Sequence, residues 1–164
     1  MNLVEGARRA VAEDAPAIVA LARQAICELA DHRGGPIWHR REAHAEPLEA
    51  TVGGHVTDPG PRRLALVATV DEVIVGYALA ELATLHDGEA LALVSDLYVE
   101  PEARGIGLGE AMMDLLVAWA RDAGAVGIDA LALPGDRATK NFFETSGLTA
   151  RAILVHRSFG GDAP

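Results

Sequence analysis

The stretch Asp96-Leu-Tyr-Val-Glu-Pro-Glu-Ala-Arg-Gly-Ile-Gly-Leu-Gly109 is the most informative part of this chain. It ends an apolar run, residues 90–99, that is typical of a buried strand, and it leads into residues whose apolar side chains recur at helical spacing. Glycines in such a turn let backbone N–H groups approach an anion closely, and the N-terminus of the helix adds roughly half a positive charge. With Arg104 at its rim, the turn is predicted to bind a pyrophosphate.

Neither common nucleotide-binding motif fits this turn. The glycines at 105, 107 and 109 are not spaced as in the G-x-G-x-x-G of dinucleotide-binding folds, and no Gly-Lys-Ser/Thr follows them for a P-loop. Three glycines also occur in an ordinary strand-to-helix turn whose backbone requires positive φ. The glycines alone therefore leave the ligand open.

The rest of the chain predicts a mixed α/β fold. Helical spacing of apolar residues indicates the helices, and short apolar runs bounded by turn residues indicate the strands. Three consecutive strands predict an antiparallel meander, and the alternating order after it predicts a mixed sheet with helices on its faces. The predicted elements are a strand at 8–11, a helix from 14 to about 34, an irregular helical segment at 36–56, strands at 64–70, 73–82 and 90–99, a helix from 108 to about 124, a strand at 128–133, a helix at 137–146 and a strand at 148–156.

Composition and charge limit the class of protein. The 164 residues are 50% hydrophobic and 23% charged, which predicts a single domain over 1–164 with one core and argues against disorder. No apolar run approaches the ~18 residues of a membrane span. A net charge of −10 opposes nucleic-acid binding and favours cationic small molecules as partners. Because the first residues lack a signal-peptide pattern, we expect a cytoplasmic protein.

Two features of the first third have mainly structural interpretations. Cys27 is the single cysteine, so it cannot form an internal disulfide, and its place in a helical pattern predicts a small buried core residue. The segment His39-Arg-Arg-Glu42-Ala-His44 suggests zinc, but it is one residue longer than H-x-x-E-H, and a five-residue offset places the two imidazoles about 140° apart on a helix. We therefore expect no metal site there.

Two motifs together resemble the GNAT (general N-acetyltransferase) family. The turn Arg104-Gly105-Ile106-Gly107-Leu108-Gly109 is similar to the family's acetyl-CoA-binding pattern Arg/Gln-x-x-Gly-x-Gly/Ala. The segment Asp136-Arg-Ala-Thr-Lys-Asn-Phe-Phe-Glu-Thr-Ser-Gly-Leu148 looks like the family's Asn-x-x-Ala-x-x-hydrophobic-Tyr-Glu-x-x-Gly-Phe. The likeness covers residues 62–156, and the first 60 residues agree only in element order. It implies the GNAT fold, a twisted and mostly antiparallel mixed sheet of about six to seven strands flanked by about four helices.

The resemblance also implies a binding site for acetyl-CoA as co-substrate, and no metal. In the family, the strand before the turn and the parallel strand after its helix splay apart, and the pantetheine arm enters between them. Backbone groups of Leu97 to Val99 would then bind the pantetheine, and those of Arg104 to Gly109 would hold the pyrophosphate. The residues predicted to bind the co-substrate are Leu97, Tyr98, Val99, Arg104, Gly105, Ile106, Gly107, Leu108, Gly109, Asp136, Asn141 and Phe143.

Two residues depart from the family pattern. Phe143 stands where the family often has the Tyr that protonates the departing CoA thiolate, and Asp136 stands where an Asn commonly binds the pantetheine. A lysine-like amine with a pKa of ~10.4 is ~3.4 units from its nucleophilic form at pH 7, whereas a thiolate with a pKa of ~8.5 leaves only ~1.5 units for an acid to recover. Loss of the acid should therefore slow such an enzyme rather than inactivate it, with water or Tyr98 protonating the sulfur.

Asp96 and Tyr98 are the predicted catalytic residues. Alternation along the strand places these two side chains on one face and those of Leu97 and Val99 on the other. If the polar pair faces the cleft, Asp96 could accept the proton of the amine directly or through water, or bind a cation. The plain alternative is a strand-end carboxylate satisfied by backbone donors, and Glu81 in the neighbouring strand is a weaker candidate for the same work.

Three functions follow from these observations. The first is direct transfer of the acetyl group of acetyl-CoA to a primary amine of a small molecule or peptide, with cationic acceptors favoured by the net charge. The second is a catalytically silent acyl-CoA sensor, motivated by Phe143 and Asp136. The third is a nucleotide-binding regulatory domain that prefers NAD or ATP to CoA. The acceptor and the acyl chain length are not set by the sequence, and the resemblance leaves room for a homodimer formed through C-terminal strands.

Overall fold

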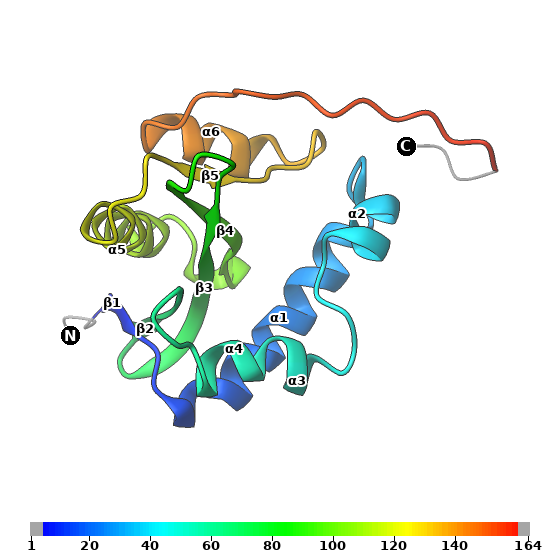
Figure 1. Cartoon of the computed structure of the whole chain (residues 1–164). Coiled ribbons are helices and arrows are strands. Elements are labelled where there is room, and N and C mark those ends of the chain that lie inside the picture. Colours follow the sequence, from blue (N-terminus) through cyan, green and yellow to red (C-terminus); the bar gives the residue numbers. More distant parts are fainter. Residues whose placement is uncertain (1–4, 161–164) are drawn as a thin grey trace.

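The computed structural model describes residues 5–160, which form one five-stranded sheet with helices on both faces (Figure 1). Helix α5 covers one face, and α1 with the short helices α3 and α4 covers the other. In chain order the elements are β1 (Glu5–Arg9), α1 (Ala15–Ala30), α2 (Gly35–Arg41), α3 (Leu48–Thr51), α4 (Gly53–Thr57), β2 (Arg63–Val70), β3 (Val73–Thr84), β4 (Ala90–Val99), α5 (Leu108–Asp122), β5 (Ile128–Ala130) and α6 (Arg137–Thr145).

The sheet confirms the predicted meander. Strands β1 to β4 are antiparallel neighbours, and β5 joins β4 in parallel, which gives the order β1-β2-β3-β4-β5. Asp71 and Glu72 form the tight turn between β2 and β3, and both have positive φ, as two-residue hairpin turns of type I′ require. The predicted bounds of β4, 90–99, match the structure. The predicted class of a mixed α/β fold is therefore correct.

The contact between β4 and β5 is short. Their paired residues run from Ala92 to Val94 on β4 and from Ile128 to Ala130 on β5. Within residues 5–160, β4 has no strand partner on that side from Ser95 to Val99. A register shift against β3 makes Ser95 an extra, bulged residue at the point where the pairing with β5 stops. We call residues 95–99 the open edge of β4.

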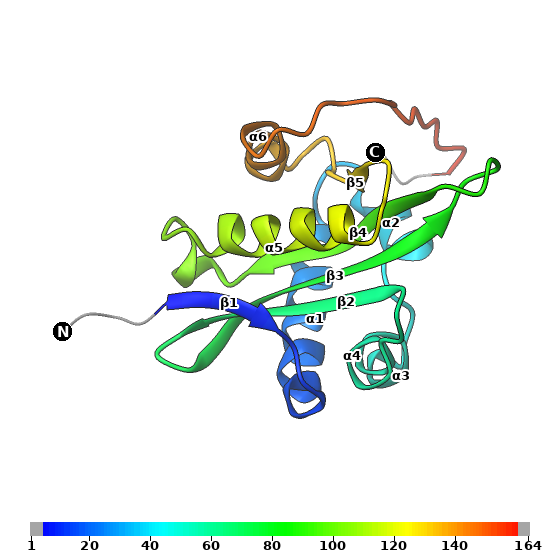
Figure 2. The same cartoon turned by 60° about the vertical axis from the view of Figure 1, so that its left-hand side comes forward.

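Two layers of buried side chains hold the sheet between its helices. On one face, Met112 and Leu116 of α5 are fully buried against the strands. On the other face, Ile18 of α1 and Val52 belong to the same buried cluster as Tyr77 of β3. Figure 2 shows α5 running along one face of the strands while α1 crosses the other. The sheet is therefore fixed from both sides, and the open edge of β4 belongs to a rigid frame.

Several expectations from the sequence were wrong. The first strand is Glu5–Arg9 instead of 8–11, and the strand predicted at 128–133 ends at Ala130. The C-terminal segment 148–156 is extended but pairs with no strand among the described residues, so the sheet has five strands instead of six to seven. The segment 36–56 folds into separate short helices, so there are more helices than about four. Cys27 is exposed, because it lies about 200° around α1 from the buried Ala25.

None of the helices in the described part of the chain is long and apolar enough to cross a bilayer.

Candidate active site

The turn between β4 and α5 has the backbone geometry of an anion site. Gly105 and Gly107 adopt φ of 82° and 92°, in the left-handed region that favours glycine. The first hydrogen bond of α5 runs from the N–H of Ala111 to the carbonyl of Gly107, so the N–H groups before it have no acceptor within the helix. A Cβ added at either glycine would meet nothing within 4 Å. The side of the turn that carries these glycines is therefore open to a ligand.

Arg104 does more than place a cation at the rim of the turn. Its Nε donates a hydrogen bond to the carbonyl of Val99 at 2.8 Å, and its Nη2 donates to both carboxylate oxygens of Glu28 at 2.9 and 3.1 Å. The guanidinium also lies 5.5 Å from the centre of the Tyr98 ring. Arg104 thus joins α1, the end of β4 and the turn, and the carboxylate of Glu28 offsets part of its charge. Sequence reasoning missed Glu28, which is 76 residues away.

Tyr98 shares the α1 face of the sheet with Asp96, as the alternation predicted, while Leu97 and Val99 pack on the α5 face. The Tyr98 hydroxyl donates a hydrogen bond to Glu28 at 3.0 Å. Burial, and then that hydrogen bond, raise the pKa of Tyr98 to about 12. Protonating a thiolate with a pKa of ~8.5 from such a group would be uphill by ~3.5 units. Tyr98 is therefore a weak acid for this step, and its catalytic role stays a prediction.

Asp96 lies at the centre of a polar cluster on the α1 face. Its Oδ1 accepts a hydrogen bond from the Tyr77 hydroxyl at 2.8 Å, and its Oδ2 accepts one from the Ser95 hydroxyl at 2.7 Å. Nε2 of His44 lies 2.6 Å from the same Oδ2. Burial alone would raise the pKa of Asp96, but these hydrogen bonds, with His44 foremost, hold it below its ordinary value. The donors are side chains and not the backbone groups of the plain alternative.

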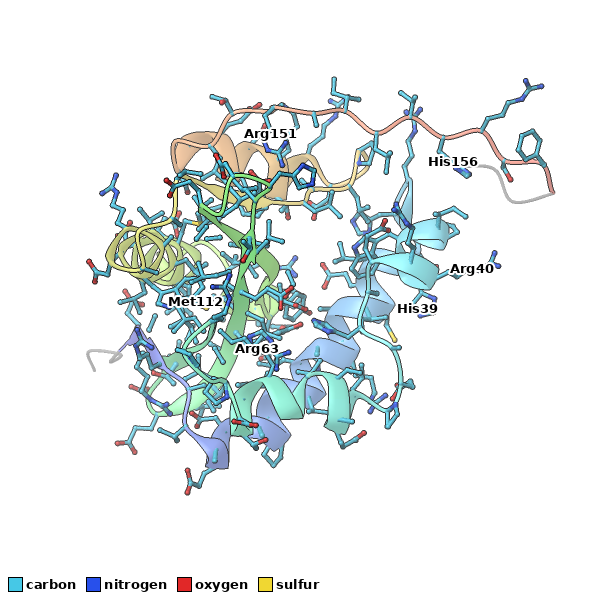
Figure 3. The ribbon with its side chains drawn as sticks, viewed as in Figure 1. His39, Arg40, Arg63, Met112, Arg151 and His156 are labelled. Carbon is cyan, nitrogen blue, oxygen red and sulfur yellow. The ribbon has the colours of Figure 1, made fainter. Side chains whose placement is uncertain are left out.

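His44 comes from the loop after α2 and was considered in the sequence only as part of a metal-like motif. Its hydrogen bond to Asp96 raises its pKa above the ordinary value, against the opposing effect of burial. Figure 3 shows His39 and Arg40 on the outer side of α2, away from the sheet. The two histidines of that motif therefore point to different places. Within residues 5–160, no three His, Cys, Asp or Glu side chains gather in a way that could hold a metal ion.

The three predicted binding residues in and just before α6 each have structural contacts. Asp136 caps α6, since its carboxylate accepts hydrogen bonds from the N–H of Thr139 at 3.1 Å and from the hydroxyl of the same residue at 2.5 Å. Asn141 is exposed, and the Phe143 ring is buried in the core on the α5 face. Phe143 thus fills a core position, and Asp136 keeps the capping ability that an Asn would have. Their contacts with a co-substrate remain predictions.

A mixed sheet whose β4 and β5 part beside a glycine turn at a helix N-terminus defines the class of CoA-dependent acetyltransferases. The model of the acetyltransferase (GNAT) family matches residues 23–148. The chain belongs to this family, whose members use acetyl-CoA as acetyl donor. The resemblance recognised in the two sequence motifs is confirmed by this match.

Solved structures share the fold at low sequence identity. A mutant of the BH1408 protein from Bacillus halodurans is 20% identical with a TM-score of 0.75, over 93% of this chain and 98% of that one. AAC(6')-Iy in complex with the bisubstrate analogue CoA-S-monomethyl-acetylneamine is 14% identical with a TM-score of 0.72, over 94% and 98%. The aminoglycoside acetyltransferase meta-AAC0020 from an uncultured soil metagenomic sample, in complex with sisomicin, is 17% identical with a TM-score of 0.70, over 96% and 97%. At these identities the likeness is one of fold, and no curated protein matches the chain in sequence.

Proposed function

We propose that this chain transfers the acetyl group of acetyl-CoA directly to a primary amine of a small molecule or peptide. The observation that carries the proposal is the glycine turn at the start of α5, next to the open edge of β4. Backbone groups of Leu97 to Val99 would bind the pantetheine arm as an added strand would. The N–H groups of Gly105 to Gly109 would hold the pyrophosphate. Membership of the family supports acetyl-CoA as the donor.

In the proposed reaction the nitrogen of the amine attacks the thioester carbonyl. A C–N bond forms, the C–S bond breaks, and the sulfur leaves with the electron pair and takes a proton from water. Backbone N–H groups near Val99 would stabilise the negative charge that develops on the carbonyl oxygen. Holding both substrates in one place supplies much of the rate enhancement in such a direct transfer, and no covalent enzyme intermediate is needed.

Acidic groups on the α1 face support a cationic acceptor. Glu28 accepts a hydrogen bond from Tyr98, Asp96 accepts one from Tyr77, and Glu81 is close enough to raise the pKa of His44. The net charge of −10 acts in the same direction at longer range. Two of the structural neighbours are aminoglycoside acetyltransferases. Amine-bearing small molecules of this kind are therefore the acceptors to test first.

Thermal unfolding with acetyl-CoA, CoA, NAD and ATP in parallel tests the donor site. A ligand at 100 times its dissociation constant adds about 2.7 kcal/mol to stability, and we expect this from acetyl-CoA and CoA alone. A panel of amines, with CoA release followed by a thiol reagent, then tests the transfer. Stabilisation by acetyl-CoA without turnover on any amine would replace the enzyme by an acyl-CoA sensor, which the buried Phe143 would suit. Stabilisation by NAD or ATP in preference to CoA would indicate a nucleotide-binding domain.

We also propose that two copies of the chain pair through the segment 149–160. Ile153 and Val155 are both 86% exposed there, and the segment has no strand partner within the described residues. Arg151 forms an ion pair with Asp129 of β5, so the segment starts beside the edge strand of the sheet. In a dimer, the extended segment of one copy would pair with the exposed sheet edge or the extended segment of the other. Sedimentation at several concentrations should give a dimer that a chain ending at Leu148 does not form; a full-length monomer at high concentration would refute it.

A further inference from the structure

The carboxylate of Asp96 has little capacity left to act as a base. Its two oxygens lie within 2.8 Å of Tyr77, Ser95 and His44, and the side chain is only 12% exposed. A proton placed on Oδ2 would displace one of two short hydrogen bonds, and one placed on Oδ1 would displace the bond from Tyr77. Protonation of Asp96 would therefore break a hydrogen bond that no other group replaces. The ionised carboxylate is better suited to orient a neighbouring side chain than to accept a proton.

The imidazole of His44 has the free acceptor that Asp96 lacks. When the ring is neutral and Nε2 donates its hydrogen to Asp96, the lone pair lies on Nδ1. Among residues 5–160, Nδ1 of His44 makes no hydrogen bond, and the side chain is 22% exposed. The carboxylate thus selects the tautomer and orients the ring, as a carboxylate does for a general-base histidine in other enzymes.

The position of this pair relates it to the proposed reaction. Asp96 lies two residues beyond Val94, the last residue of β4 that pairs with β5, and so falls within the open edge. The loop that carries His44 reaches the same point from α2, across 52 residues of sequence. The imidazole therefore stands on the α1 face, next to the part of β4 where the thioester would bind.

We propose that His44 is the catalytic base of this chain and that Asp96 is its positioning residue, a proposal that rests on the proposed acetyl transfer. The amine nitrogen forms a bond to the thioester carbon, and its proton passes to Nδ1 of His44. The C–S bond breaks, and the electron pair leaves with the sulfur of CoA, which water protonates. The imidazolium then returns its proton to solvent, while Asp96 stays ionised throughout.

The charged groups around His44 set the direction of the pH dependence. Asp96 and, more weakly, Glu81 favour the imidazolium, and burial opposes it, so that the pKa of His44 is raised above its ordinary value of ~6.5. Tyr77 contacts the pair only through Asp96. Because the base acts in its neutral form, kcat/KM should fall more steeply below that raised pKa than protonation of the acceptor amine alone predicts. This acid limb is a property that a merely structural histidine would not produce.

The test compares His44→Gln with His39→Gln, a matched control on the exposed side of α2. We expect His44→Gln to lower kcat by about 10²- to 10⁴-fold, the range for a lost general base, while acetyl-CoA still raises the melting temperature as in the wild type. The limb that belongs to His44 should disappear, which leaves only the fall in kcat/KM that protonation of the acceptor amine causes. The control should retain both kcat and the limb. A His44→Gln enzyme with wild-type kcat and an unchanged limb would overturn the proposal.

Asp96→Asn supplies a second readout. Without the carboxylate, the pKa of His44 should fall, so the acid limb should move to lower pH and the NMR titration of its imidazole should move with it. A limb and a titration that both stay in place would overturn the positioning role. If the wild type acetylates no amine in the panel, the proposed function itself fails and this proposal with it; if the wild type is active but His44→Gln equals it, only the base is misassigned.

Discussion

The two faces of the sheet use different chemistry to do different work. On the α5 face, the buried cluster consists of apolar side chains, with Met112 and Leu116 at its centre. On the α1 face lie both buried polar or charged residues of the described chain, Asp14 and His55, and also the clusters around Asp96 and Tyr98. Burying polar groups is costly unless each finds a partner. The α5 face thus packs apolar side chains together, while the α1 face also buries polar groups, and within the described residues each buried side-chain N or O atom has a hydrogen-bond partner.

The largest expected effect is on the apolar face. Leu116→Ala should lower the free energy of unfolding by about 2–5 kcal/mol, because it leaves a cavity in a fully buried site. Leu115→Ala, one position away and 38% exposed, is the matched control and should cost far less. Urea denaturation of both variants measures the difference. Equal losses in the free energy of unfolding would mean that burial at position 116 is not the source of its contribution to stability. In both variants kcat per folded molecule should be unchanged.

The next effect concerns the glycine turn between β4 and α5. Gly107→Ala forces a side chain into a left-handed conformation, at a cost of about 1–2 kcal/mol. We expect acetyl-CoA to bind about tenfold more weakly, measured by calorimetry. Gly6→Ala is the control, since Gly6 lies in β1 without positive φ or a neighbour within 4 Å of an added Cβ. Unchanged affinity in Gly107→Ala would show that the turn geometry is not needed for binding.

A smaller effect should appear as acid sensitivity of the α1 face. The Arg8 side chain, which hydrogen-bonds Asp14, holds the pKa of that carboxyl below its ordinary value, against burial. Its unfolded pKa is ~3.9, so the ion pair stabilises the fold fully above that pH and stops doing so as the pH falls through the lower folded value. Asp14→Asn should lower stability by about 1 kcal/mol at pH 7, since Arg8 is half-exposed, and should flatten the acid limb of the unfolding curve. A limb of unchanged steepness would assign the acid sensitivity to other carboxylates.

The smallest expected effect on stability is that of Glu28→Gln. The pair with Arg104 is partly exposed, so the free energy of unfolding should change by less than about 0.5 kcal/mol. The pKa of Tyr98 should nevertheless fall part of the way from about 12 towards 10, because burial remains while the carboxylate is gone. Alkaline titration of tyrosinate absorbance in a Tyr77→Phe background, which leaves one tyrosine, measures the shift. An unmoved titration would place the cause in burial alone.

Local patterns were sufficient to predict the strand, turn and helix around residues 90–124. A glycine that needs positive φ, an apolar run and a helical period are all properties of neighbouring residues, and so β4 and the start of α5 agree with the prediction. The shared face of Asp96 and Tyr98 followed from alternation in the same way. These features need no knowledge of the rest of the chain.

The remaining features depend on partners that are distant in sequence. The contacts of Asp96 with His44 and of Arg104 with Glu28 span 52 and 76 residues, and no local spacing points to them. The segment 148–156 has the residue types of a strand, but a strand also needs a neighbour, and within the described chain it has none. The cap that Asp136 forms on α6 was not predicted, and its contact with a co-substrate stays a prediction.

Strand β4 is an interior strand for one half of its length and an edge strand for the other. Backbone amides that face an unpaired edge exchange their hydrogens with water readily, whereas those held in a ladder exchange only when the structure opens. The paired residues 92–94 can therefore serve as an internal reference for residues 95–99 of the same strand. A ligand that takes the place of the missing strand would slow exchange at those amides of residues 95–99 that point away from β3 and leave residues 92–94 unchanged, so occupancy could be followed without any turnover.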